Sequence, residues 1–431
     1  MSEKLTVEAL IDDLSPAERQ RAERVEAVLP ALRDKAVEGD REGEFPTEHV
    51  KTLSEAGLLG LAVPEQFGGL GGGLRDIVGA CFAMGTACPS TALSFFFHNS
   101  SASRGLLPLE ALDAGLFDDE EAPVVKAFAE RLLTRMGEGR WMANFASESA
   151  KSASSAITIG TSAEPGTDAD GNKGWRLTGV KSFGCATGVA DDYLVAAKLP
   201  GGDTAEYLAV FMVDRRAEGV GERERWDAIG MRATATHGIT LEDVFVPEAD
   251  ALAIPGAFVN MMQVSRGSFV GSQVAGTACY LGAAQAIYDY AINHLTTSKF
   301  ADTGEPIGTA PFQQQLIGSM SMHLGTARHW LLNQLDLETS EPPKLPKPEV
   351  VANWRIAKGV VAEEGFAVAQ NALKACGTSN TAFSGLVSRM YRDLTMGLVQ
   401  AFPAERGRLE AASTIVKGHE STQFGGTKSG G

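Results

Sequence analysis

The sequence has little that would cross-link the chain or carry it into a membrane. Its 431 residues include five cysteines, which are scattered, odd in number and without Cys-x-x-Cys spacing. They disfavour a disulfide scaffold and fit a reduced, cytoplasmic setting. No apolar run reaches the roughly 18 residues that a membrane-spanning helix needs. His, Cys and carboxylate residues form no cluster with metal-ligand spacing, so no metal site is predicted.

Positive charge is also scarce. The chain has 38 Lys and Arg against 54 Asp and Glu, which gives a formal net charge of -16. Because so acidic a surface repels phosphate groups, nonspecific binding to nucleic acid or to an anionic membrane is not expected. The remaining composition is that of an ordinary globular protein, and the length suggests two or three domains.

Patterns typical of strands are confined to the middle of the chain, residues 141–250. Short runs rich in Val, Tyr and Phe, such as 192–197 and 207–213, alternate apolar and polar side chains. Clusters of Gly, Pro and Asp at 165–171 and 200–203 predict hairpin turns between such runs. We therefore expect a small antiparallel β domain here.

The segment before it, residues 1–140, predicts a helical domain. Ser15 and Glu18 have the spacing of a capping box, with proline at the first helical position between them. Residues 80–97 are apolar enough for one buried helix. His98, at the edge of this helix, more often packs or caps than catalyses in such a place.

The segment after it, residues 251–418, predicts an up-and-down four-helix bundle. Four long helical patterns follow one another, at 258–296, 312–337, 350–375 and 383–401. The proline-rich connection 341–348 cannot continue a helix and is expected to be exposed. The last residues, 419–431, are rich in Gly, Ser and Thr and predict a flexible tail.

This order of helices, β domain and bundle resembles that of the acyl-CoA dehydrogenase family. Residues 63–71, Val-Pro-Glu-Gln-Phe-Gly-Gly-Leu-Gly, are a close variant of a family segment. Further similar segments follow in the family's order, at 145–148, 179–183, 230–234, 242–247 and 389–393. The resemblance extends over nearly the whole chain. It implies an α+β fold with an N-terminal helical domain, a central antiparallel β domain and a C-terminal four-helix bundle.

The resemblance also implies a function. Relatives bind FAD between the β domain and the bundle, assemble as homodimers or homotetramers, and oxidise an acyl thioester carried by coenzyme A or a carrier protein. A glutamate removes the α proton while a hydride moves to the flavin. That proton is weakly acidic, so the reaction needs a well-placed carboxylate and donors for the developing enolate. The cofactor carries the redox step.

Flavin-binding positions are carried over from the family residue by residue. They are Phe145, Ala146, Ser147, Ser152, Phe183, Cys185, Lys299, Phe300, Gln314, Cys376 and Gly377. Cys185 stands where a hydroxyl usually meets the flavin, and we expect it to be a packing residue rather than a redox thiol. Thr297 replaces the arginine that usually reaches the neighbouring subunit's cofactor, with Lys299 close by. Glu148 holds a position that is usually structural.

The family's catalytic glutamate is absent at its usual place. The alignment puts Ala401 there, and alanine cannot accept a proton. The alternative position used by some relatives falls at Gly271 or Ser272, and neither can serve as a base. Glu405 is the nearest carboxylate, one helical turn beyond, and is more often a solvated charge in such a place. No catalytic residue is therefore assigned.

Three functions remain open. The first is an FAD-dependent dehydrogenase of an acyl thioester with a non-standard base, which passes its electrons to an acceptor. The second is a monooxygenase on the same fold, since some relatives use reduced flavin from a reductase, with O2, to hydroxylate N, S or aromatic carbon without an α-proton base. The third is a homologue without redox chemistry.

Overall fold

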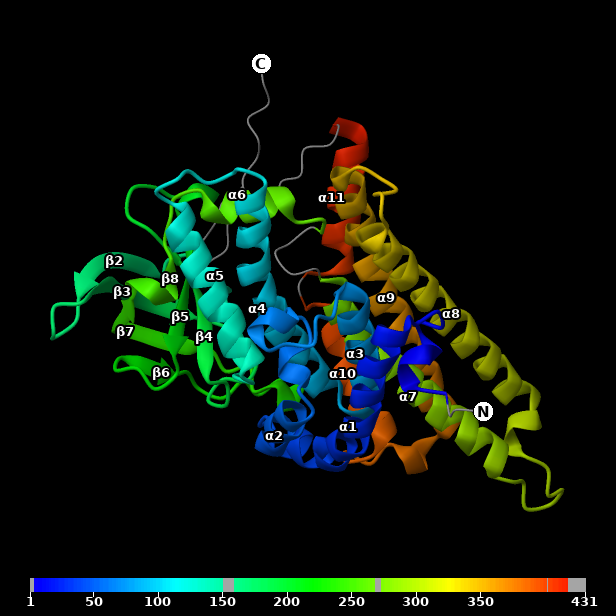
Figure 1. Ribbon diagram of the computed structural model, residues 1–431. Helices are drawn as coiled ribbons and strands as arrows, with labels where there is room; N and C mark the ends of the chain where they lie inside the picture. The colour runs from blue at the N-terminus through cyan, green and yellow to red at the C-terminus, as the bar shows by residue number, and fades with distance from the viewer. Residues whose placement is uncertain (1–3, 150–158, 268–272, 401, 418–431) are drawn as a thin grey trace.

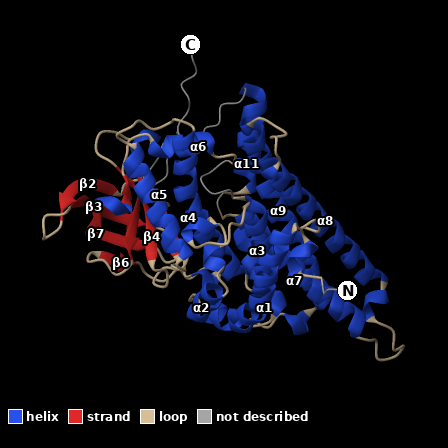
Figure 2. Ribbon diagram, viewed as in Figure 1, coloured by secondary structure: helices blue, strands red, loops and turns tan. Residues whose placement is uncertain are grey.

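The computed structural model describes residues 4–149, 159–267, 273–400 and 402–417 (Figure 1). Figure 2 shows the strands gathered on one side of the molecule and helices over the remainder. Within the described ranges, no helix is both long and apolar enough to cross a membrane. In the same ranges, no group of three or more His, Cys, Asp or Glu side chains is placed to hold a metal ion.

The N-terminal part is helical, as predicted. Its helices are α1 (Pro16–Glu42), α2 (Thr47–Glu55), α3 (Leu74–Ala87), α4 (Pro89–Asp113) and α5 (Ala122–Gly137). The capping box at the start of α1 is confirmed: the Ser15 hydroxyl accepts from the Glu18 amide at 3.3 Å, and the Glu18 carboxylate accepts from the Ser15 amide at 2.8 Å.

Two of the predicted helices are each split in two. Residues 80–97 do not form one helix, because α3 ends at Ala87 and α4 begins at Pro89, with Cys88 extended between them. A residue before proline avoids the helical region, and proline suits the first turn of a new helix. The predicted helix 258–296 is also wrong as a single element: α6 (Ala257–Val264) ends before a non-helical Ser265, and α7 (Val274–Thr297) follows.

Within the described part of the chain, the central sheet has eight strands. They are β1 (Met142–Phe145), β2 (Ser162–Thr167), β3 (Lys173–Lys181), β4 (Asp192–Lys198), β5 (Leu208–Asp214), β6 (Val220–Glu222), β7 (Ile239–Pro247) and β8 (Ala251–Leu252). Their order is β6-β7-β3-β2-β4-β5-β8, with β1 beside β4. The turns lie close to the predicted places, although Pro165 and Gly166 belong to β2.

The sheet is not wholly antiparallel, which corrects the prediction. β1 runs parallel to β4 along its length, and β2 meets β4 in parallel at one residue pair. The whole β2–β3 hairpin lies between β1 and β4 in sequence, so the chain can return in the same direction, as a parallel pair requires. One apolar cluster packs α5 and α6 on β4 and β5 through Phe128, Met212 and Met261.

The predicted bundle is formed by α7, α8 (Pro311–Thr339), α9 (Lys347–Cys376) and α10 (Leu386–Gly397), and α11 (Ala404–Lys417) packs on α9. Figure 1 shows α7, α8 and α9 running side by side away from the sheet. The small residues of α7 permit close contact with α3, since a Cβ on Gly282 would lie 2.1 Å from the carbonyl oxygen of Phe82. The predicted tail, 419–431, lies outside the described residues.

The β domain is joined to the bundle through the turn that follows Gly230. The Asp393 carboxylate on α10 accepts a 2.6 Å hydrogen bond from the amide of Met231. Its neighbour Arg392 forms a 2.5 Å ion pair with Asp40 at the end of α1. A Cβ on Gly230 would lie 2.0 Å from the carbonyl oxygen of Arg392, so the turn and α10 touch backbone to backbone. This contact sets the position of the loop between β6 and β7.

Replacing Gly230 with alanine tests this junction. The added methyl group meets a helix carbonyl that cannot move aside, so we expect the free energy of unfolding to fall by about 1–3 kcal/mol. Gly318 on α8 is the matched control, because a Cβ added there would meet no atom within 4 Å. Gly318→Ala is expected to be neutral, or stabilising by up to about 1 kcal/mol. Urea unfolding measures both, and equal stabilities would contradict the close contact.

Candidate functional site

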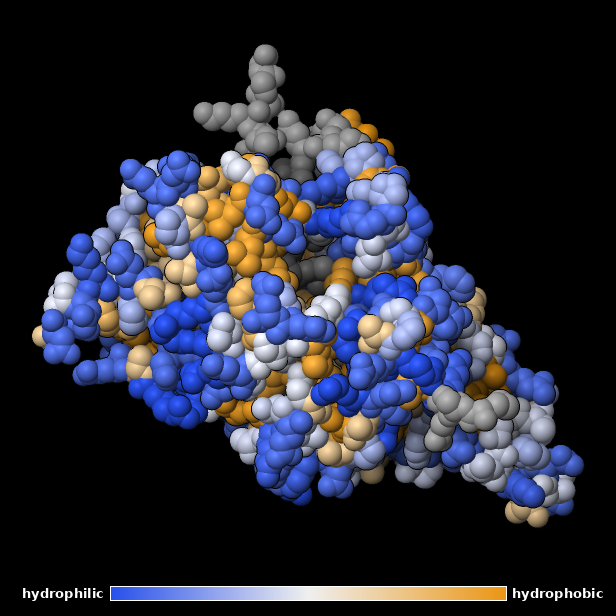
Figure 3. Space-filling model, viewed as in Figure 1, coloured by the Kyte–Doolittle hydropathy of each residue, from blue (hydrophilic) through white to orange (hydrophobic). Residues whose placement is uncertain are grey.

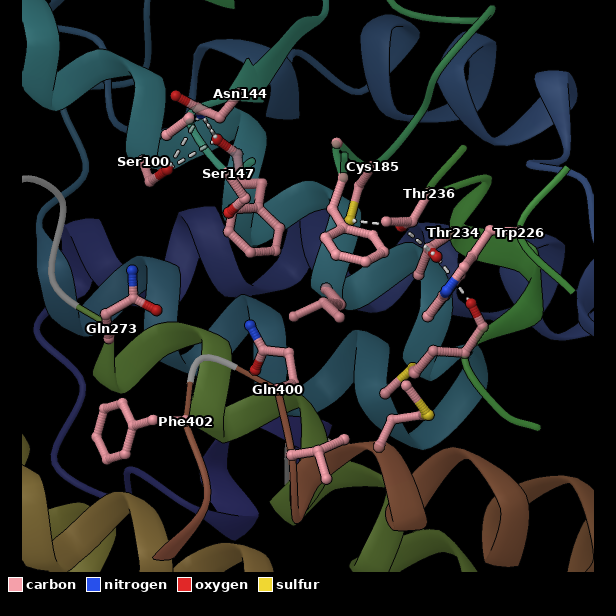
Figure 4. A pocket seen from close by; sticks show the side chains of 18 of the residues that line it. Ser100, Asn144, Ser147, Cys185, Trp226, Thr234, Thr236, Gln273, Gln400 and Phe402 are labelled. Atoms are coloured by element: carbon pink, nitrogen blue, oxygen red, sulfur yellow. Dashed lines mark hydrogen bonds between the residues drawn. The ribbon is translucent and has the colours of Figure 1, made fainter. Parts of the chain in front are cut away.

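A cavity of about 530 Å³ lies where α4, the sheet and the bundle meet. Figure 4 shows side chains converging on it from these three parts of the molecule. The lining residues are Leu93, Phe97, Ser100 and Arg104 from α4; Asn144, Ala146, Ser147, Phe183, Gly184, Cys185, Trp226, Met231, Thr234 and Thr236 from the β domain; and Gln273, Tyr280, Trp354, Met396, Val399, Gln400 and Phe402 from the helices beyond.

One face of α4 forms a wall of the cavity. Leu93, Phe97, Ser100 and Arg104 recur every three or four residues and so lie along one side of the helix. Arg104 is buried, and desolvation lowers the pKa of its guanidinium to about 10. Its Nη1 donates to the carbonyl oxygen of Ser100 at 2.9 Å and to the Ser103 hydroxyl at 3.1 Å. The cavity wall thus contains the cationic guanidinium of Arg104, and its hydrogen-bond partners include these two neutral groups.

The two predicted flavin-contacting segments meet at this cavity. Ser147 and Phe183 form an isolated antiparallel bridge, in which the Ser182 amide donates to the carbonyl oxygen of Ser147 at 2.9 Å. Ala146, Ser147, Phe183 and Cys185 line the cavity.

Phe145 and Ser152 are not among the lining residues. The ring of Phe145 is fully buried with its centroid 4.6 Å from that of Tyr193. It packs behind the wall, so close that a Cβ on Gly184 would lie 2.2 Å from it. Ser152 lies outside the described residues.

An aromatic surface stands open at the cavity. The Phe183 side chain is 48% exposed, and its ring packs edge-on to Trp226 with 6.2 Å between centroids. A flat aromatic ligand that stacks on this half-exposed ring would bury its apolar surface and so bind more tightly. Trp226 belongs to a loop without a recognised motif, and the sequence analysis missed it.

A chain of hydroxyl groups lies beside this ring. The Thr234 and Thr236 hydroxyls are 2.7 Å apart, and the Thr236 hydroxyl donates to the Cys185 sulfur at 3.3 Å. Burial raises the pKa of the Cys185 thiol to about 11, so the sulfur stays protonated at neutral pH. This agrees with its interpretation as a packing residue, since the thiolate is the reactive form. Neither threonine was named as a site residue from the sequence.

The described lining of the cavity contains no Asp, Glu or His side chain. Glu405 is 76% exposed and lies 3.5 Å from Arg408, away from the cavity. His98 is buried with both ring nitrogens bonded to backbone: Nδ1 accepts from Met142 at 3.0 Å, and Nε2 donates to Leu59 at 2.7 Å. Burial lowers its pKa to about 4. Ala401, Gly271 and Ser272 lie outside the described residues.

A second group of predicted flavin positions lies at the far end of the bundle. Lys299 pairs through its backbone with Pro306 beyond α7, and Gln314 is exposed at the start of α8. Phe300 is 38% exposed, and Cys376 and Gly377 end α9. The Gln313 amide reaches the carbonyl oxygen of Ala375 at 3.5 Å, which places these helix ends together. None of the five lines the cavity, and their assignment to the flavin stays a prediction from the family resemblance.

The cavity residues fit a flavin ring. The half-exposed face of Phe183 can stack on a planar ring, and the hydroxyls of Ser147, Thr234 and Thr236 offer hydrogen bonds to its polar edge. Behind this wall, Lys181 is fully buried and forms a 2.7 Å ion pair with Glu148. Burial opposes ionisation of Glu148, but hydrogen bonds from Lys181 and Thr161 lower its pKa overall. Glu148 therefore has a structural role beside the site.

Glu148→Gln is expected to destabilise the fold by about 3–5 kcal/mol, because it leaves the buried Lys181 ammonium without its counter-charge. The double variant Glu148→Gln/Lys181→Met should recover most of that loss. Glu23, which is 58% exposed and lies 3.6 Å from Arg19, is the control, and Glu23→Gln should cost less than about 1 kcal/mol. Chemical unfolding measures all three. A stable single variant with an unstable double variant would contradict this role.

The pH dependence of stability tests Asp393. Burial raises its pKa from 3.8 to about 6, so the folded protein holds this proton more tightly than the unfolded chain. That contribution is complete below 3.8 and is lost as the pH rises through about 6. Asp393→Asn keeps an acceptor for Met231 but cannot titrate. Relative to the wild type, it should gain roughly 1–3 kcal/mol between about pH 4 and pH 7. Plots of unfolding free energy against pH that stay parallel for the variant and the wild type would contradict the raised pKa. Asp243→Asn, at an exposed carboxylate, is the control.

Comparison with known proteins agrees with this architecture. The N-terminal, middle and C-terminal domain models of the acyl-CoA dehydrogenases match residues 16–108, 146–244 and 275–402. YdbM from Bacillus subtilis, whose name assigns it to these dehydrogenases, is 28% identical over 88% of this chain and 92% of its own. L-evernosamine nitrososynthase from a Micromonospora species is 28% identical over 89% of this chain and 86% of its own.

A solved structure has a similar fold. KijD3 in complex with dTDP has a TM-score of 0.77 and 26% identity, and the match covers 96% of this chain and 100% of that one. The fold, the order of the domains and the matched segments thus agree along the chain. The protein belongs to the acyl-CoA dehydrogenase family, whose members are flavin-dependent oxidoreductases.

Proposed function

We propose that this protein is a flavin-dependent monooxygenase, which uses reduced flavin and O2 to oxygenate a small molecule at N, S or aromatic carbon. One observation carries the proposal: no carboxylate or imidazole belongs to the described lining of the flavin cavity. Dehydrogenation of a thioester needs such a base beside the α carbon. Oxygenation needs no α-proton base. We therefore rank the monooxygenase above the dehydrogenase, which is the first of the three functions that the sequence leaves open.

The similarity to nitrososynthases supports oxygen transfer. A nitroso group contains an N–O bond, so a product of that kind requires oxygenation at nitrogen. The relatives named as acyl-CoA dehydrogenases keep the dehydrogenase as the second candidate. The apolar wall formed by Leu93 and Phe97 would accommodate an acyl chain equally well.

The residues of the cavity have separate tasks in this proposal. When bound, reduced flavin supplies the electrons that activate O2. Phe183 and Trp226 cover the ring, and Leu93 and Phe97 keep water out. The side-chain amides of Gln273 and Gln400 can orient the substrate.

A diffusible cofactor fits these contacts better than a permanently bound one. Arg104 is the one charged side chain in the described lining of the cavity, and Thr297 replaces the arginine that would hold a pyrophosphate. FAD, the cofactor expected from the sequence, and FMN are therefore both candidates, delivered reduced by a separate reductase. We place the protein in the cytoplasm because its five cysteines are buried free thiols. A homodimer or homotetramer is proposed from the family resemblance alone.

Two measurements test the function together. Under anaerobic conditions, acyl-CoA thioesters should leave bound oxidised flavin unbleached. With reduced FMN or FAD and O2, a panel of amines, thioethers and phenols should yield a product heavier by one oxygen atom, detected by mass spectrometry. Bleaching by a thioester would establish the dehydrogenase instead.

The place of the flavin is tested separately. Phe183→Leu removes the stacking surface and should weaken flavin binding roughly fivefold to tenfold, which corresponds to about 1 kcal/mol. Met322→Leu, at a 60% exposed position on α8, is the control and should bind flavin as the wild type does. Fluorescence titration gives both affinities, and equal values would place the ring elsewhere.

A further inference from the structure

Trp226 stands at the flavin cavity on a loop without regular secondary structure. The loop covers residues 223–230, directly after β6. Residues 223–225 are exposed, and Figure 3 shows hydrophilic side chains gathered at the lower left of the molecule, where β6 lies. Because this part of the loop buries little apolar surface, its position depends on hydrogen bonds and ion pairs.

The backbone of Trp226 is held by a histidine. Its amide donates to Nδ1 of the buried His237 at 3.1 Å. Since Nδ1 accepts this hydrogen bond, the neutral ring carries its hydrogen on Nε2, which donates to the Glu44 carboxylate at 3.4 Å. The same carboxylate lies 3.7 Å from Nε of Arg225, the residue before Trp226. Glu44, between α1 and α2, thus contacts both the loop and the histidine that holds it.

His237 belongs to a segment that is fixed in place. It follows Thr236, which lines the cavity, and precedes Gly238, which has a positive φ of 81°. A Cβ on Gly238 would lie 2.4 Å from the carbonyl oxygen of Lys181 at the end of β3, so this segment and β3 touch backbone to backbone. His237 itself is not among the lining residues of the cavity, so any effect that it has on a ligand there passes through a neighbour.

We propose that His237 is a positioning residue for flavin binding: its Nδ1 fixes the backbone of Trp226, so that the indole stays against Phe183 in the cavity wall. The two rings pack edge-on with 6.2 Å between their centroids, and both line the cavity. An aromatic wall that is already formed binds a planar ring more tightly, because the loop need not be ordered when the ligand arrives. An oxygenase and a dehydrogenase would both bind flavin here, so this role does not depend on which reaction follows.

Two substitutions separate the roles of the two ring nitrogens. The side-chain amide of asparagine reaches about as far as Nδ1 of histidine, and that of glutamine about as far as Nε2. His237→Asn therefore keeps an acceptor for Trp226, whereas His237→Gln keeps only the contact with Glu44. We expect His237→Gln to weaken FMN binding about threefold to tenfold, and His237→Asn to stay within about twofold of the wild type.

Fluorescence titration measures these affinities. His329→Gln, at an exposed position on α8, is the matched control and should bind FMN as the wild type does. Equal affinities of the two His237 variants, whether weakened or unchanged, would overturn the proposal, because the position of the acceptor would then make no difference.

A double-mutant cycle shows whether His237 acts through Trp226. Trp226→Ala removes the indole and should itself weaken FMN binding about threefold to tenfold. Adding His237→Gln to Trp226→Ala should weaken binding no further, because the ring that His237 positions is then absent. A second loss as large as the one that His237→Gln causes alone would overturn the role assigned to His237.

A measurement without flavin tests the hydrogen bond separately from the place of the cofactor. The chain has five tryptophans, and Trp226→Phe gives the emission of the others, which is subtracted. In His237→Gln, but not in His237→Asn, the emission of Trp226 should shift to longer wavelength and be quenched more strongly by acrylamide, because the released indole meets solvent. The same emission in both variants would overturn the proposal. A shift without any loss of FMN affinity would overturn the part of His237 in flavin binding.

Discussion

The rest of the structure depends on the hydrogen bond between the Asp393 carboxylate and the amide of Met231. Met231 and Ala235 both have positive φ, at 52° and 46°, which costs a non-glycine residue of order 1 kcal/mol or more each. Asp393 holds one end of this strained turn, and amides of the 186–187 segment bind the carbonyl oxygens of Thr234 and Ala235 at the other. These hydrogen bonds hold the hydroxyl groups of Thr234 and Thr236 at the cavity, between the sheet and the bundle.

The walls of the flavin cavity carry little charge. The flavin cavity presents apolar rings, neutral hydroxyls and one guanidinium in its described lining, which suits a planar cofactor and gives no group to remove a proton from carbon. The family's chemistry of thioester oxidation would need such a base beside the α carbon of the substrate.

Much of the fold could be predicted from the sequence, because its signals are local. The capping box at Ser15 and the alternation in β4 and β5 depend on neighbouring residues alone. Pro89 also indicates a break, although the mostly apolar run 80–97 favours one helix. The parallel pairing of β1 cannot be predicted in this way, since it depends on where a distant strand lies.

Fewer residues of the site than of the fold could be predicted from the sequence. Family segments indicated Ser147, Phe183 and Cys185, which do line the cavity. Trp226, Thr236 and Gln273 come from segments without a motif and meet the others only through tertiary packing. One usable signal lies on α4, where Arg104 is a charged residue in the buried part of the helix, since buried polar side chains need a partner.

The central claim is that oxygen from O2 enters the substrate in a cavity whose described lining has no base to remove a proton from carbon. Isotopically labelled O2, supplied with reduced flavin and an amine that the protein converts, tests it most directly. The account predicts that the product contains one labelled oxygen atom, by mass spectrometry. An unlabelled product, or an unsaturated thioester formed from an acyl thioester without O2, would contradict it.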